Sequence, residues 1–141
     1  MHVAFLADRG LPPVPVEHER TAVSRRAFEL FVGAVSRWGL SLEEQARLLN
    51  TSVSSLQRLQ RALAGGASFP TFDEDRLLRL SLIANIDRDL RLSFADGIGL
   101  AWLRAANPAF AGRAPLAAML RDGMQGLAQV FVEMRDWTLG R

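Results

Sequence analysis

The sequence predicts an all-α protein, and three features of the residue pattern support this. Apolar residues recur at steps of three and four over most of the chain, which is the period of an α-helix. No polar–apolar alternation runs longer than a few positions, so strands are not expected. Glycine, asparagine and proline punctuate the periodic stretches. With 141 residues, 49% of them hydrophobic, the chain can bury the core of one compact domain or of two small modules.

The first expected helix covers residues 21–37 and follows an arm, residues 1–20, which three prolines favour as extended or poorly ordered. Gly39 fits a helix stop after it. One face of this helix is apolar and is formed by Ala27, Leu30, Phe31, Ala34, Val35 and Trp38. Their spacing predicts that this face enters the core.

The second and third helices are expected close together, over residues 41–49 and 53–64. Ser41 with Glu44 three residues later forms a capping box, which predicts the start of the second helix. Asn50 follows its end, and asparagine tolerates the left-handed conformation that a tight turn requires. The two helices should therefore be joined by a short turn.

The fourth helix is expected to be long, over residues 72–94. Thr71 and Glu74 form a second capping box at its start. Its apolar residues cover two sides, Leu77, Leu80 and Ala84 on one and Leu78, Leu82 and Ile86 on the other. A helix that is apolar on two sides packs against two neighbours, which can include a second chain.

Three further helices are expected, over residues 96–106, from about Pro115 onward, and over residues 124–137. Asn107-Pro108 ends the first of these, and proline suits the first turn of the next. The apolar faces are Ile98, Ala101, Trp102 and Ala105 in one helix and Met124, Leu127, Ala128, Phe131 and Met134 in the last.

Residues 42–60 have the pattern of a helix-turn-helix, which assigns residues 21–66 to a helix-turn-helix domain. Ala46 is small enough for two helices to cross, Asn50 suits the turn, and Leu56 and Leu59 would hold the second helix. Such a helix presents its outer side to the major groove of DNA. The candidate DNA contacts are Ser52, Ser54, Ser55, Gln57, Arg58 and Arg61.

The positive charge of the chain is concentrated in the same segment. Residues 20–66 carry seven Arg and three Glu, a net charge of +4, whereas residues 67–141 carry nine Arg and nine acidic residues. This distribution suits a polyanionic partner for the first segment. The alternative, a plain helical hairpin whose arginines form a solvated face, remains open at this point.

The run from Trp102 to Leu116 resembles the signature W-L-x-x-x-N-P-x-(apolar)-x-G-x-x-P-L of the Xre/MbcA/ParS-like antitoxins. Asp122-Gly123 followed by an apolar helix is similar to the same pattern. The resemblance covers roughly residues 22–139. The residues themselves have architectural roles, because Trp is a core anchor and Asn-Pro, Gly and Pro end or begin helices.

The resemblance implies a Cro-like helix-turn-helix followed by a helical module, residues 67–141, for dimerisation and toxin contact. It implies an antitoxin whose partner is a RES-domain toxin that consumes NAD or transfers ADP-ribose. The antitoxin would occlude the toxin's active site, form a homodimer, and repress its own operon by binding operator DNA. A free-standing dimeric helix-turn-helix transcription regulator without a toxin partner is the alternative.

The resemblance implies that the toxin contacts lie toward the C-terminus, because in such antitoxins residues near that end obstruct the NAD site of the toxin. The candidate residues are Arg113, Arg135, Asp136, Trp137 and Arg141. An exposed Trp near a terminus is a good interface anchor. The competing interpretation of Trp137 is that it only closes the core.

The composition argues against an enzyme or a metal protein. The chain has no Cys and two His, His2 and His18, so it does not supply the ligands of a zinc site. No serine lies in a nucleophile elbow. We expect no catalytic residue, metal, cofactor or small-molecule substrate. No apolar run reaches the ~18 residues of a membrane span, and no signal peptide is evident, which predicts a cytoplasmic protein without membrane contact.

Overall fold

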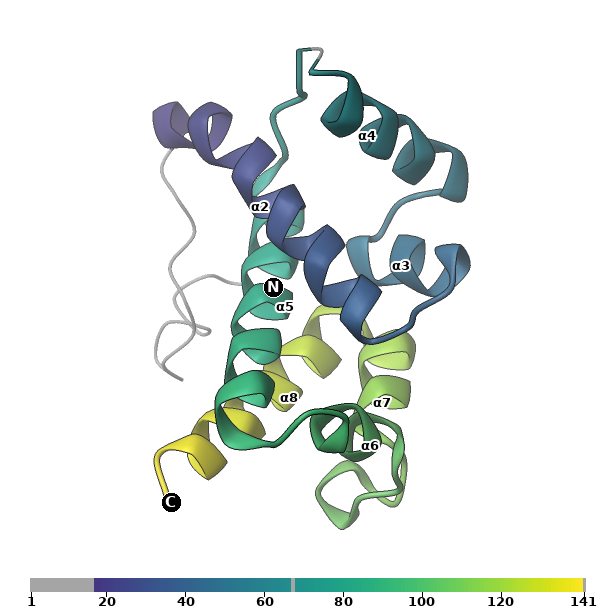
Figure 1. The fold of residues 1–141 in the computed structure, drawn as a ribbon, viewed down its shortest axis with the longest axis vertical. Helices are drawn as coiled ribbons and strands as arrows, with labels where there is room; N and C mark the ends of the chain where they lie inside the picture. Colours follow the sequence, from purple (N-terminus) through teal and green to yellow (C-terminus); the bar gives the residue numbers. More distant parts are fainter. Residues whose placement is uncertain (1–16, 67, 141) are drawn as a thin grey trace. The chain divides into compact units, whose positions relative to one another are not determined.

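The computed structural model describes residues 17–66 and 68–140, and this part of the chain is all-helical, as predicted (Figure 1). It contains seven α-helices, one 3-10 helix and no strand. The chain forms two compact units that divide between Ala84 and Asn85, inside helix α5 (Glu74–Ser93). The sequence predicts a domain boundary at residue 66, and the long helix contributes its first half to one compact unit and its second half to the other.

Helix α2 (Glu17–Arg37) begins four residues before its predicted start, within the segment expected to be an extended arm. Residues 1–16 of that arm lie outside the described residues. The predicted face is correct at Phe31, Ala34, Val35 and Trp38 and wrong at Leu30, which is 40% exposed. Phe28 is buried in its place, because its ring packs against Phe31, Phe69 and Phe72 with centroids 5.5–6.2 Å away.

Helices α3 (Leu42–Leu49) and α4 (Val53–Gly65) are joined by the short turn that the sequence predicted (Figure 1). The hydroxyl of Ser41 accepts the Glu44 N–H at 3.1 Å, and the Glu44 carboxylate accepts the Ser41 N–H at 2.9 Å, which confirms the capping box. Asn50 has the left-handed conformation, with φ 57°. Ser52 caps α4 by accepting the Ser55 N–H at 3.1 Å.

Helix α5 begins two residues later than predicted, and its cap is Asp73. The Asp73 carboxylate accepts the N–H of Arg76 at 2.9 Å, so the expected capping box of Thr71 and Glu74 is wrong. Two oxygens make a carboxylate an effective cap, and its charge suits the positive end of the helix. The helix is buried on several sides, through Leu77, Leu78, Leu80, Leu82, Ile83, Ile86 and Leu90.

In the unit after Ala84, helix α6 (Ile98–Arg104) is shorter than predicted and buries a different face. Gly99 and Leu103 are buried, whereas Ile98, from the expected face, is 53% exposed. A Cβ at Gly99 would lie 3.4 Å from Cβ of Leu90, an ordinary packing distance, so the Gly99 side of α6 faces Leu90 of α5.

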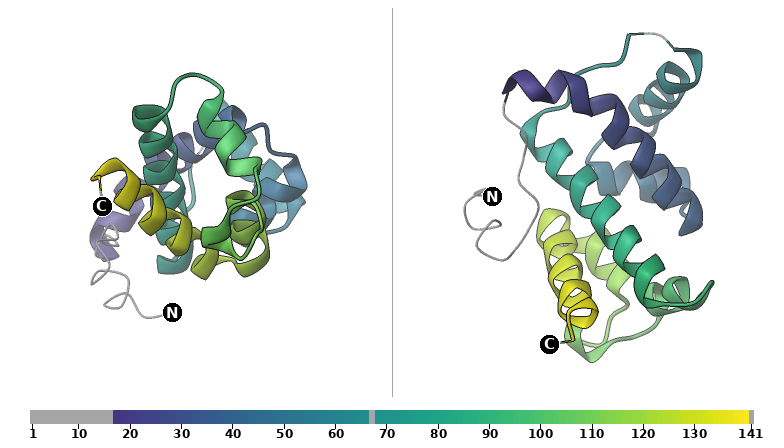
Figure 2. Two further views of the ribbon diagram at one scale, coloured as in Figure 1. Left: turned by 90° about the horizontal axis from the view of Figure 1, so that it is seen from below. Right: turned by 60° about the vertical axis from the view of Figure 1, so that its left-hand side comes forward.

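A 3-10 helix (Pro108–Phe110) leads to helices α7 (Pro115–Asp122) and α8 (Met124–Thr138), which lie side by side (Figure 2). Pro115 begins α7, as predicted. The buried residues of α8 include the whole predicted face, Met124, Leu127, Ala128, Phe131 and Met134. Gly126 lies against the backbone of α7, since a Cβ there would overlap the carbonyl oxygen of Ala118.

Candidate functional site

The outer side of α4 carries most of the candidate DNA contacts. Ser54, Gln57, Arg58 and Arg61 are exposed, and their spacing of three and four places them on one face of the helix, which we call the exposed face of α4. Leu56, on the opposite side, is fully buried and anchors the helix in its unit. The structure therefore brings these four predicted residues together on one accessible surface.

The two remaining candidates, Ser52 and Ser55, lie at the start of α4 and already take part in local bonds. Ser52 is exposed, and its hydroxyl caps the helix. Ser55 is half-buried, and its hydroxyl accepts a hydrogen bond from Nη2 of Arg58 at 2.9 Å. Each hydroxyl keeps its own O–H for donation to a further acceptor such as a phosphate oxygen.

The cations of the exposed face are available for a polyanion. Among the side chains that the structure describes, those of residues 23–66 and 68–140, no acidic group forms an ion pair with Arg58 or Arg61. Both guanidiniums are exposed to solvent. Neutralising a DNA phosphate would therefore not require an existing salt bridge to break.

Two arginines of α5 hold the turn that precedes α4. Nη2 of Arg76 donates to the carbonyl of Asn50 at 2.6 Å, and Nη1 of Arg79 donates to the carbonyl of Leu48 at 3.2 Å. Both carbonyls lie at the C-terminal end of α3, where a helix leaves carbonyls without partners and where cations are stabilised. The turn angle between α3 and α4 is thus fixed by side chains from another helix.

Acidic neighbours keep these two arginines in place. Asp73 pairs with Arg76 at 2.7 Å, and Asp75 pairs with Arg79 at 2.9 Å. Arg79 is only 9% exposed. The sequence analysis did not identify these arginines as supports of the turn. The available signal was the spacing of each acid, three or four residues before an arginine.

The other end of α4 is tied to α2. Nη2 of Arg25 donates to the carbonyl of Leu63, near the end of α4, at 2.9 Å. The hydroxyl of Ser24, which is buried, accepts the N–H of Phe72 at 3.1 Å and so fixes the segment that leads into α5. The last turn of α4 and the turn that precedes the helix are therefore both held by hydrogen bonds from other helices, which supports one orientation of its exposed face.

Of the predicted toxin contacts, Trp137 is the most accessible, with 58% of its surface exposed. It is the outer end of a row of rings, Trp137, Phe94, Trp102 and Phe110, whose successive centroids are 5.8, 6.3 and 6.3 Å apart. We call this row the aromatic chain. Its inner end, Phe110, is buried, so the aromatic chain runs from the core to the exposed indole of Trp137.

The other predicted toxin contacts have different surroundings. Arg135 pairs with Asp89, which is 2% exposed, at 3.2 Å and lies over the ring of Phe131. It therefore has a structural role of its own. Arg113 pairs with Asp122 at 3.7 Å, and both are partly exposed. Asp136 is half-buried, and Arg141 lies outside the described residues.

The residues of the Trp102–Leu116 run have the architectural roles that their types suggested. The side chain of Asn107 accepts the N–H of Ala109 at 3.0 Å, and its backbone N–H donates to the carbonyl of Arg113 at 3.1 Å. The ring of Trp102 meets that of Phe110 edge-on. The run forms a closed loop between α6 and α7 that supports the aromatic chain.

The described part of the chain offers neither a metal site nor a membrane span. Among its residues, no three His, Asp or Glu side chains are grouped so as to hold a metal ion. None of its helices has both the length and the apolar composition needed to cross a bilayer.

Comparison with known proteins identifies the first of the two units. The model of the antitoxin Xre-like helix-turn-helix domain matches residues 14–85, which include α2, α3, α4 and the first half of α5. A comparison with curated proteins found no match. The family consists of antitoxins, which are not enzymes. Since the match covers half of the sequence, the chain belongs to the antitoxin Xre-like helix-turn-helix family.

Proposed function

We propose that this antitoxin neutralises a RES-domain toxin through its C-terminal unit and represses its own operon through α4. Membership of the antitoxin family implies a cognate toxin and DNA binding. The toxin class and the occlusion of its active site rest on the resemblance of the Trp102–Leu116 run. We also propose that the protein acts in the cytoplasm as a homodimer.

The exposed face of α4 supports the DNA-binding part of the proposal. Arginine can bind guanine through two hydrogen bonds, and glutamine can bind adenine in the same way. Arg58, Arg61 and Gln57 therefore suit base contacts, while Ser52, Ser54 and Ser55 suit phosphates. Each phosphate that the protein neutralises contributes a slope of about −0.9 to log K against log salt. A single copy offers few such contacts, and a dimer on two half-sites doubles them.

The exposed end of the aromatic chain supports the toxin-binding part. A rigidly held indole loses little conformational entropy when it enters a partner's pocket, and Trp is enriched among residues that dominate binding. Leu139, which is also exposed, adds apolar area two residues further on. We propose Trp137 as the anchor, with Arg113, Asp136 and Arg141 as polar contacts around it. Arg135 would position α8 through Asp89 rather than meet the toxin.

Co-expression with the product of the neighbouring gene tests the proposal. We expect a stable complex that restores growth of cells expressing the neighbour alone. Trp137→Ala should weaken the complex at least tenfold, because a central Trp contact contributes about 2 kcal/mol or more. Gln125→Ala, exposed at the start of the same helix, is the matched control and should have no effect.

The same experiment separates the two candidate functions. If the protein binds its own upstream DNA but forms no complex and rescues no growth, it is a free-standing dimeric regulator. If neither complex nor DNA binding is found, both proposals fail. Equal loss of DNA binding and toxin binding in an Arg58→Ala, Arg61→Ala double variant would contradict the assignment of the two activities to separate surfaces.

A further inference from the structure

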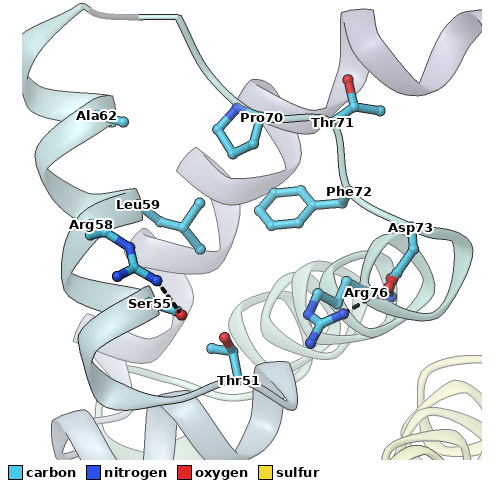
Figure 3. Close-up of a pocket in the computed structure, with 10 residues that line it drawn as sticks. All are labelled: Thr51, Ser55, Arg58, Leu59, Ala62, Pro70, Thr71, Phe72, Asp73 and Arg76. Atoms are coloured by element: carbon cyan, nitrogen blue, oxygen red, sulfur yellow. Dashed lines mark hydrogen bonds and ion pairs between the residues drawn. The ribbon is translucent and has the colours of Figure 1, made fainter.

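A pocket of about 530 Å³ lies beside α4, between this helix and the segment that leads into α5 (Figure 3). All the residues that line it belong to positions 51–76, so it lies within one compact unit. Its volume falls in the range of sites for small molecules, about 300–1,000 Å³. Two of the proposed DNA contacts, Ser55 and Arg58, line this pocket, but DNA binding by the outer side of α4 does not itself require a pocket.

One part of the pocket is apolar. Leu59 and Ala62 contribute to it from α4, and Pro70 and Phe72 contribute from the facing segment that leads into α5 (Figure 3). The Phe72 backbone is held by Ser24, and its ring packs against Phe28 and Phe69, so this side of the pocket is already formed in the free protein. An apolar lining of this kind suits an aromatic or compact aliphatic group.

The other part of the pocket is polar and carries two guanidiniums, those of Arg58 and Arg76. Arg76 is fixed by Asp73 at 2.7 Å and by the Asn50 carbonyl at 2.6 Å, and these bonds use two of its five N–H donors. Asp73 is the acid that lines the pocket, so the two cations leave a net positive charge of one. The hydroxyls of Thr51, Ser55 and Thr71 add further polar groups.

Arg58 belongs to the pocket and to the exposed face of α4 at the same time. It lines the pocket with Ser55, Leu59 and Ala62, and it is also exposed alongside Gln57 and Arg61. Its guanidinium is bonded to Ser55 and has no acidic partner among the described residues. It is therefore the cation that an incoming anion can recruit without breaking an ion pair.

We propose that this pocket binds a small amphiphilic anion, in which a phosphate or carboxylate group is attached to an aromatic body. Arg58 and Arg76 bind the oxyanion through charge-assisted hydrogen bonds. The ring lies against Leu59 and Phe72, where its apolar surface leaves water.

A regulatory consequence follows, and it rests on the proposed DNA binding. A guanidinium that binds the anion in the pocket cannot contact a base or a phosphate of DNA at the same time. The ligand and the operator therefore compete for Arg58, and the ligand lowers the affinity for DNA. The same oxyanion chemistry could also come from a DNA backbone phosphate, and the experiment below distinguishes the two sources.

The first arm of the test measures ligand binding by the full chain in the absence of DNA. Phenyl phosphate is titrated by calorimetry and by amide chemical shifts, with inorganic phosphate and benzyl alcohol as comparison probes. We expect saturable binding of phenyl phosphate, with shifts confined to residues 51–76, and binding of each comparison probe at least about tenfold weaker. Absence of saturable binding overturns the proposal. Inorganic phosphate that binds as tightly as phenyl phosphate overturns it too and assigns the pocket to backbone phosphates.

Matched variants locate the site. Arg58→Gln should weaken phenyl phosphate binding about tenfold or more, because it removes a charge-assisted bond. Arg61→Gln removes the same charge one turn further along α4, outside the pocket, and should keep ligand binding. Ala62→Phe should abolish binding by filling the apolar part, and its thermal melt checks that it folds. Equal effects of Arg58→Gln and Arg61→Gln would show a nonspecific charge effect and overturn the proposal.

The second arm adds the upstream DNA to the wild-type protein. Phenyl phosphate should lower the affinity for DNA about tenfold, whereas inorganic phosphate at the same ionic strength should not. Ligand binding without any change in DNA affinity refutes competition for Arg58. If the protein binds no DNA, the proposed function fails while ligand binding in the first arm stands, so the two failures are distinguishable.

Discussion

Replacing Gly126 by alanine tests the close packing of α7 and α8. A Cβ at this position would overlap the carbonyl oxygen of Ala118 and lie 2.9 Å from Cα of Met119. Both atoms are backbone, so no side chain can rotate away and one helix must shift. Gly126 is itself buried within α8, so the added methyl group cannot reach solvent. The substitution therefore forces either a displaced helix or a strained contact.

Two opposing terms set the size of this effect. Inside a helix, alanine is more stabilising than glycine by about 1 kcal/mol of folding free energy. Adding a methyl group to a well-packed core costs about 1–3 kcal/mol, and a clash with backbone lies at or above the top of that range. We therefore expect Gly126→Ala to lose about 2 kcal/mol of stability. For a chain of this length, that lowers the melting temperature by roughly 4–8 °C.

Gly65→Ala is the matched control, because it makes the same substitution in open space. No atom lies within 4 Å of a Cβ at Gly65, which is the last residue of α4. Only the gain in helix propensity remains, about 0.5–1 kcal/mol at most. Thermal melts followed by circular dichroism should move in opposite directions for the two variants. The reasoning fails if Gly126→Ala melts at or above the wild-type temperature.

Three further substitutions test the bonds that shape the two surfaces. Arg79→Met should destabilise the protein by about 1–3 kcal/mol in urea unfolding, because it leaves the carbonyl of Leu48 without its partner. Arg61→Ala should weaken binding of the upstream DNA and reduce the salt slope by about one, as measured by fluorescence anisotropy at several salt concentrations. Asp89→Ala should cost about 2–4 kcal/mol in urea unfolding, since it leaves Arg135 without the buried carboxylate.

Each of these substitutions has a control and an outcome that would contradict it. Arg121→Met removes an exposed arginine whose only ion pair within the described residues is a 3.9 Å contact with the partly exposed Asp122, and it should change stability by less than about 0.5 kcal/mol. If Arg79→Met and this control lose the same free energy of unfolding, Arg79 does not stabilise the turn before α4. An unchanged salt slope in Arg61→Ala would remove this residue from the DNA contacts. A loss below about 0.5 kcal/mol in Asp89→Ala would show that its pair with Arg135 contributes little.

The sequence predicted which residues form the candidate DNA-binding surface. It did not predict which residues of other segments pack beside that surface. The exposure of Ser54, Gln57, Arg58 and Arg61 follows from helical spacing once Leu56 is taken as the buried residue. The pocket beside them could not be predicted, because its second wall comes from residues 70–76, which approach α4 only through tertiary packing.

The candidate toxin-binding surface shows the same division. The sequence left open whether Trp137 is exposed or closes the core, and the structure shows it 58% exposed with its ring against Phe94, just after α5. Arg135 was expected to meet the toxin because it lies near the C-terminus. The structure pairs it with Asp89, 46 residues earlier in the sequence.

By itself, the sequence determined the helices and most of their ends. The capping box of Ser41 and Glu44, the left-handed Asn50 and the buried face of α8 all depend on residues within about four positions of one another, so a short window of sequence contains them. Tertiary structure alone decided which face α6 buries and which side chain holds the turn before α4. Arg79 reaches a carbonyl 31 residues away, and the buried side of α6 is the one where Gly99 lies against Leu90. Such contacts depend on how helices pack, and the periodicity of a single helix carries no information about its neighbour.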